Sequence, residues 1–154
     1  MLNIHNIPKP VYRAYQLLAR SGDLRYLVNG SHPTLGVFAT NSNQTSTEYL
    51  VFVYNHNLPG FPINNESLSV TINGVSDPHS INATIERIDE EHSNAPGVWR
   101  AMGSPEYLNS TQVKALKESS QLEAQPLKSS SIGKSSVTYT IDIPANAVAL
   151  ITLT

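Results

Sequence analysis

Strict alternation of apolar and polar residues most constrains the fold of this chain. In residues 67–72, Leu, Val and Ile alternate with Ser and Thr, and residues 137–143 repeat the pattern with Val, Tyr and Ile. Successive side chains of a β-strand point to opposite faces, so each segment predicts a strand with one buried and one solvated face. The chain is therefore expected to be mainly β, and an antiparallel β-sandwich is the natural closure of such strands.

A third alternating segment covers residues 81–86. The alternation assigns Ile81, Ala83 and Ile85 to the core. It assigns Asn82, Thr84 and Glu86 to solvent. Asn73-Gly74, just after the first strand, is typical of a tight hairpin turn. The serine-rich segment 119–136 is expected to be a mobile loop.

Two helices are predicted, one at the N-terminus and a short one near residues 111–118. Pro10 suits a first helical turn, and Gly22 suits a C-terminal cap. Between them an apolar stripe repeats at helical spacing, formed by Val11, Ala14, Tyr15 and Leu18. We therefore expect an N-terminal helical segment over residues 1–22, followed by a β-sandwich domain over residues 23–154.

Composition excludes several classes of protein. The 154 residues are 40% hydrophobic and only 14% charged, which is typical of one compact module rather than a disordered chain. A net charge of −2 gives no reason to expect nucleic acid, and no apolar run is long enough to span a bilayer. The five histidines lack metal-ligand spacing, so no metal is expected, and no motif indicates a cofactor.

Five N-x-[ST] sequons indicate a secreted or extracellular protein, with a lysosomal location as the alternative. The candidate N-glycosylation sites are Asn29, Asn43, Asn65, Asn82 and Asn109. Asn82 is a leading candidate, because alternation places it on the outward face of its strand. Asn43 lies in a polar run and is equally accessible by composition. The absence of cysteine excludes disulfides and is neutral on the compartment.

A polar cluster follows the strand at 81–88. Its sugar-binding candidates are Asp89, Glu91, His92, Asn94 and Trp99. Carboxylates and amides suit vicinal hydroxyls, and an aromatic face suits the C–H surface of a pyranose. The alternative is that the cluster holds a loop in place and that Trp99 belongs to the core. Carboxylates that are neighbours on one loop seldom flank a scissile bond, so no catalytic residue is expected here.

Residues 85–94, with Val98-Trp99-Arg100 and Met102-Gly103-Ser104-Pro105, resemble a segment of glycoside hydrolase family 39, the β-xylosidase and α-L-iduronidase family. Residues 8–18 resemble the last barrel helix of that family, and residues 50–56 and 149–153 resemble strands of its C-terminal β-sandwich. The family's catalytic carboxylates sit on barrel strands, which would lie before residue 1. The resemblance therefore implies the accessory half of a glycosidase, not itself an enzyme.

Three functions are compatible with this reading. The first hypothesis is a non-catalytic, lectin-like protein that binds a carbohydrate or glycoconjugate. The alternatives are the C-terminal accessory fragment of a xylosidase- or iduronidase-like enzyme, which braces the barrel, and a structural extracellular protein. If no barrel is present, the helix surface formed by Val11, Tyr15 and Leu18 needs another partner, which the sandwich itself, a companion chain or a second copy could supply. We expect a homo-oligomer, or a companion chain from the same precursor.

Overall fold

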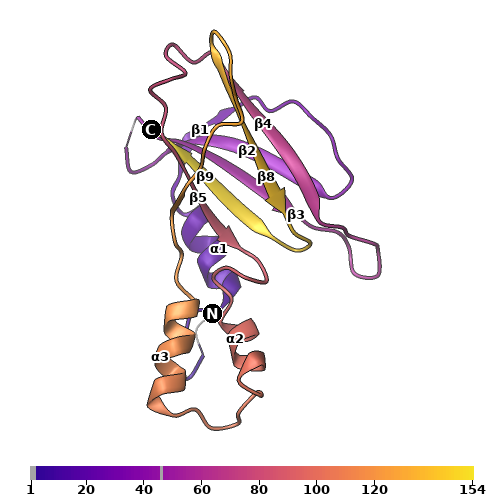
Figure 1. The fold of residues 1–154 in the computed structure, drawn as a ribbon, viewed down its shortest axis with the longest axis vertical. Helices are drawn as coiled ribbons and strands as arrows, with labels where there is room; N and C mark the ends of the chain where they lie inside the picture. The colour runs from indigo at the N-terminus through magenta and orange to yellow at the C-terminus, as the bar shows by residue number, and fades with distance from the viewer. Residues whose placement is uncertain (1–2, 46) are drawn as a thin grey trace.

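The computed structural model describes residues 3–45 and 47–154, which form two antiparallel sheets and a small helical lobe (Figure 1). The helices are α1 (Pro10–Leu18), α2 (Ala95–Ala101) and α3 (Ser110–Ser119). The strands are β1 (Ser21–Tyr26), β2 (Leu35–Ser42), β3 (Tyr49–Asn55), β4 (Glu66–Asn73), β5 (Ala83–Ile88), β6 (Gln125–Pro126), β7 (Ser131–Ile132), β8 (Ser136–Ile143) and β9 (Val148–Leu153). The expected mainly β sandwich is confirmed.

The larger sheet has the strand order β1-β2-β3-β9-β5-β6, and its central strands are buried on both faces. On β3, Val51 and Val53 face the smaller sheet, whereas Leu50 and Phe52 lie on the opposite face. Phe52 stacks on Phe38 of β2, with 4.5 Å between ring centroids. A continuous apolar run such as Leu50–Val53 is what a strand covered on both sides requires.

The smaller sheet has the order β4-β8-β7 and contributes the other half of the core. The inward residues of β8 are almost completely buried, and they are Val137, Tyr139, Ile141 and Ile143. β4 pairs with β8 along its whole length, from Glu66 opposite Ile143 to Asn73 opposite Ser136. Asn73-Gly74 is therefore not the turn of a local hairpin as predicted, because the next strand, β5, belongs to the larger sheet.

The first helix begins at Pro10 as expected but ends at Leu18, so the predicted cap at Gly22 is wrong. Gly22 instead lies in β1, where a Cβ atom would come within 2.4 Å of the Asn41 side chain. That side chain accepts a hydrogen bond from the backbone N–H of Leu24. Gly22 is needed for this close approach across the β1–β2 pair rather than for ending a helix.

α1 covers the face of the larger sheet that the smaller sheet leaves open (Figure 1). Leu17 is completely buried there, and Ala14 packs beside it. The other members of the predicted stripe lie on the flank of the helix and are about half exposed, namely Val11, Tyr15 and Leu18. The larger sheet therefore buries only one side of the apolar surface of α1.

The helical lobe lies at one end of the molecule, beyond α1. The expected helix near 111–118 is confirmed as α3. A capping box between Asn109 and Gln112 forms its N-terminus. α2 was not predicted from the sequence. Its Ala95 packs with Leu116 of α3 and with Ile7 of the N-terminal segment in a small separate core.

Within segment 119–136, predicted to be loop, β6 and β7 add two short pairings.

Replacing Leu17 by Ala should destabilise the fold by about 2–5 kcal/mol. The reason is that a cavity would open between α1 and the centre of the larger sheet, which is covered on both faces. The neighbouring Leu18, 42% exposed, is the matched control, and Leu18→Ala should cost less than about 1 kcal/mol. Urea unfolding of the two variants measures the difference. Equal losses would show that α1 does not pack on the sheet in solution.

Candidate functional site

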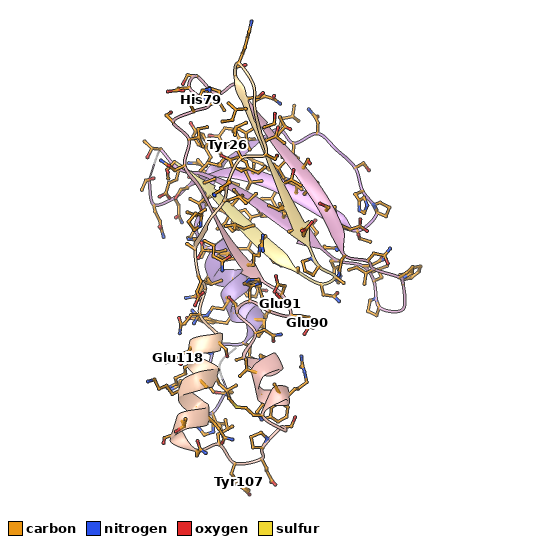
Figure 2. The ribbon with its side chains drawn as sticks, in the orientation of Figure 1. Tyr26, His79, Glu90, Glu91, Tyr107 and Glu118 are labelled. Carbon is orange, nitrogen blue, oxygen red and sulfur yellow. The ribbon has the colours of Figure 1, made fainter. Side chains whose placement is uncertain are left out.

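The predicted sugar-binding residues lie on the loop that follows β5 and in α2. Figure 2 labels Glu91 on this loop. β5 ends at Ile88, and the turn that follows closes with a backbone hydrogen bond from Asp89 N–H to the carbonyl of His92. Ser93 then adopts a positive φ of 53°. Its hydroxyl donates to the carbonyls of Arg87 and Gln121, which ties the loop to the segment after α3.

The Asp89 carboxylate is fully engaged inside its own loop. Oδ1 accepts hydrogen bonds from the backbone N–H groups of Glu91 and His92, both at 2.8 Å. The same oxygen lies 2.8 Å from Nδ1 of the His92 ring. The Asp89 side chain is only 4% exposed, so its lone pairs are directed at the protein and away from solvent. This is the geometry of a turn-stabilising aspartate.

Asn94 and Trp99 are also occupied by local structure. The Asn94 side chain caps α2 by accepting from Gly97 N–H at 3.0 Å, and it donates to the carbonyl of Glu90. The indole Nε1 of Trp99 donates to the carbonyl of Pro105 at 3.1 Å, which holds the turn after α2. Trp99 remains 37% exposed, so part of its ring faces solvent rather than the core.

The structure therefore brings Asp89 and His92 together, and it engages the side chains of Asp89, Asn94 and Trp99 in local hydrogen bonds. Among the five predicted residues, Glu91 is exposed and the ring of Trp99 is partly so. Sugar binding at this cluster is untested and stays a prediction. What the geometry establishes is an ordered connection between the sandwich and the helical lobe.

A second polar region lies where α1 packs against β5. The sequence placed Glu86 in solvent, which is wrong: it is 8% exposed and forms an ion pair with Arg20. The alternation did put Glu86 on the face opposite Ile85, but α1 covers that face. Only contact between distant segments could reveal this pair, because 66 residues separate its members.

Arg13 of α1 extends the same polar region. Its Nε donates to the carbonyl of Ser120 at 2.6 Å, and Nη2 donates to the Gln121 side chain at 3.0 Å. Burial lowers the pKa of the Arg13 guanidinium. A cavity of about 390 Å³ opens beside these groups, lined by Arg13, Gln16, Ala19, Arg20, Gln44, Glu86, Gln121 and Leu122. Sequence reasoning missed this region because no local motif marks it.

The third feature is the outer flank of α1. Val11, Tyr15 and Leu18 are 48%, 57% and 42% exposed. They recur at three- and four-residue spacing, so they lie on one side of the helix. Contiguous exposed apolar side chains of this size are typical of a surface that another protein element covers.

The other expectations concern modification, metals and membranes. All five sequon asparagines are exposed, and Asn82 lies on the outward side of β5's start as expected. Within residues 3–45 and 47–154, no group of three or more metal-binding side chains comes together. In the same described ranges, no helix has the length and apolar character needed to cross a membrane.

Comparison with known proteins gives the family. The profile of glycosyl hydrolases family 39 matches residues 1–135, so this chain belongs to that family. A β-xylosidase of Caldicellulosiruptor saccharolyticus is 32% identical over 155 residues. That match covers 99% of this chain but 31% of the relative, so the chain spans about a third of the relative's length.

Solved structures show the same fold. A family 39 enzyme from Xanthomonas axonopodis pv. citri matches with a TM-score of 0.74 at 16% identity, covering 99% of this chain and 31% of that one. A family 39 β-xylosidase from Caulobacter crescentus matches with a TM-score of 0.64 at 23% identity, covering 99% and 29%. The β-sandwich with its first helix is therefore a recurring portion of larger family members.

Substituting Asp89 by Ala should destabilise the chain by about 1–3 kcal/mol, because two backbone N–H groups would lose their acceptor. Glu91→Ala is the matched control and should change stability by less than about 0.5 kcal/mol, since that side chain is exposed. Thermal unfolding followed by circular dichroism measures both. If the two variants unfold together with the wild type, Asp89 does not hold the loop.

Proposed function

We propose that this chain is a non-catalytic accessory module of a family 39 glycosidase and that it braces the catalytic barrel through the outer flank of α1. The observation that carries the proposal is the half-exposed apolar flank formed by Val11, Tyr15 and Leu18. The helix that bears it resembles the last barrel helix of the family. In this arrangement one edge of α1 packs on the sandwich and the other on the barrel.

Polar contacts at several places along the chain support a bracing role. Arg13 and Arg20 anchor α1 to the segment after α3 and to β5. Asp89, Ser93 and Asn94 then fix the path from β5 into α2. Helix, sheet and lobe are thus joined by buried and partly buried polar contacts, and satisfied polar networks of this kind make a structure more rigid. A module that positions a neighbouring domain needs this rigidity.

The lectin-like hypothesis finds less support in the geometry. A sugar site needs convergent free polar groups, whereas the carboxylate of Asp89 and the amide of Asn94 are used within the fold. The partly exposed ring of Trp99 is the feature that favours sugar binding. Titration with xylose and with xylo-oligosaccharides, followed by the fluorescence of this single tryptophan, separates the two functions. A saturable change that Glu91→Ala abolishes would support the lectin instead.

Purified on its own, the chain should not hydrolyse aryl β-xylosides or aryl α-L-iduronides. The physical reason is that glycoside hydrolysis needs two carboxyl groups on either side of the scissile bond, roughly 5–10 Å apart. The two carboxylates among the predicted site residues, Asp89 and Glu91, are neighbours on one loop. The Asp89 carboxylate is already hydrogen-bonded within that loop. Release of nitrophenol is the measurement. Turnover that disappears in Asp89→Asn or Glu91→Gln would refute the accessory role.

The bracing surface is tested in a longer polypeptide that includes the upstream coding region. There, Tyr15→Ser with Leu18→Ser should lower stability by several kcal/mol, since each fully buried side chain contributes roughly 1.5–3 kcal/mol. In the isolated chain the same pair should cost less than about 1 kcal/mol, because both side chains are already half exposed. Calorimetry of both proteins gives the comparison.

Tyr107, which is 85% exposed in the helical lobe, supplies the control, and Tyr107→Ser should leave both proteins unchanged. Equal effects of the α1 substitutions in the long and short proteins would contradict bracing. So would a coding sequence that has no barrel region upstream.

A further inference from the structure

The open cavity beside Arg13 and Arg20 has room for a small ligand. Its volume of about 390 Å³ lies within the roughly 300–1,000 Å³ that is usual for small-molecule sites. Four stretches of chain line it, namely α1 with the residues just after it, the turn between β2 and β3, strand β5, and the segment after α3. Because these stretches are far apart in sequence, the tertiary fold creates the cavity and no single loop does.

Glu86 supplies a hydrogen-bond acceptor to the cavity. Its side chain is only 10% exposed, and Oε2 is paired with Arg20. The other carboxylate oxygen, Oε1, accepts no hydrogen bond from any residue that the structure describes, and it is not among the atoms sealed inside the protein. Since Glu86 lines the cavity, a ligand hydroxyl placed there can donate to this oxygen.

Arg20 supplies the donors. Within residues 3–45 and 47–154, its guanidinium makes one hydrogen bond, from Nη2 to Glu86. Nη1 thus keeps both of its N–H groups, and Arg20 also lines the cavity. The ion pair therefore presents a carboxylate oxygen and guanidinium N–H groups side by side. The matching pattern on a ligand is two neighbouring hydroxyls, one that donates to Glu86 and one that accepts from Arg20.

Glutamine amides and two apolar side chains complete the lining. Gln16 accepts a hydrogen bond from Arg13 through Oε1, so its Nε2 group remains a donor. The exposed amide of Gln44 forms no hydrogen bond with the part of the chain that the structure describes, and an amide can both donate and accept. Ala19 and Leu122 offer apolar contact to the C–H groups of a ligand.

The charges favour a neutral ligand. Arg20 and Glu86 neutralise each other. Arg13 directs its guanidinium at three acceptors of the protein, which are the Ser120 carbonyl and the side chains of two glutamines. No cation in the lining is therefore left over for an anion, and the Glu86 carboxylate would repel a negative group placed against it.

We propose that this cavity binds one neutral pyranose ring through a pair of vicinal hydroxyls. One hydroxyl donates to Oε1 of Glu86, and its neighbour accepts from Nη1 of Arg20. The C–H surface of the ring lies toward Ala19 and Leu122, and a further hydroxyl reaches the amide of Gln44.

This site is distinct from the two surfaces described above. None of the three residues on the outer flank of α1 lines the cavity, so the proposal does not depend on bracing. None of the five sugar-binding residues predicted from the sequence lines it either. The free polar groups that the loop after β5 lacks converge here, where α1 meets β5.

The test is a titration of the isolated chain with methyl β-D-xylopyranoside, followed through the side-chain amide signals of Gln16 and Gln44 in ¹⁵N NMR spectra. Both signals should shift saturably, with a dissociation constant in the millimolar range. Cyclohexanol has a six-membered ring but no vicinal hydroxyls, and it should cause no saturable shift. D-Glucuronate adds a negative charge to a pyranose and should bind about tenfold more weakly or worse, because Glu86 repels it.

Three variants locate the site. Glu86→Gln keeps the shape of the side chain but removes its charge, so it should weaken binding about tenfold or more. Gln44→Ala removes an exposed side chain and should weaken binding a few-fold without changing the urea midpoint. Gln125→Ala removes an exposed glutamine of β6 outside the cavity, and this matched control should change neither. If Glu86→Gln lowers the urea midpoint strongly, the comparison of Gln44→Ala with Gln125→Ala decides alone.

Several results would overturn the proposal. One is the absence of a saturable shift at both glutamine amides, and another is equal binding of cyclohexanol. Tighter binding of glucuronate would make the cavity an anion site instead. Binding that Glu91→Ala abolishes and Gln44→Ala leaves unchanged would place the sugar on the loop after β5. None of these results bears on the α1 substitutions, which test bracing separately.

Discussion

Burial of the central β3–β9 pair on both faces is the constraint on which the rest of the structure depends. Val51 and Ile151 face the smaller sheet, while Phe52 and Leu150 face α1. A strand pair that is apolar on both sides is stable only when both faces are covered. The smaller sheet and the first helix are therefore both needed to cover this pair, although the sheet comes from the middle and the C-terminal part of the sequence and the helix from the N-terminal part.

Covering the second face with a helix creates the polar region of the molecule. α1 lies over the outward side of β5, so Glu86 loses its water and is paired with Arg20. Removing one partner of such a buried pair would leave an uncompensated charge, which is costly. Arg13 carries the connection on to Ser120 and Gln121. The apolar packing of Leu17 and these polar contacts together fix α1 in one orientation, with its outer flank exposed to solvent.

The exposed flank of α1 follows from incomplete cover. The apolar surface of this helix is wide enough to pack on two sides, but the sandwich covers one side only. The bracing contact that we propose for Val11, Tyr15 and Leu18 would cover the other side.

The sequence by itself determined the strands whose two faces differ, because period-two alternation is a local property of residues 67–72, 81–85 and 137–143. It also determined the start of α1 at Pro10 and, through its motifs, the family. The tertiary structure alone decided the environment of Glu86, the role of Gly22 and the partner of β4. Alternation gives the side of a strand on which a residue lies but not what covers that side. Gly22 depends on Asn41, nineteen residues away along the chain, and β4 pairs with β8, whose partner residues lie 63 to 77 positions further on. Those outcomes come from contacts between distant segments, which no local pattern encodes.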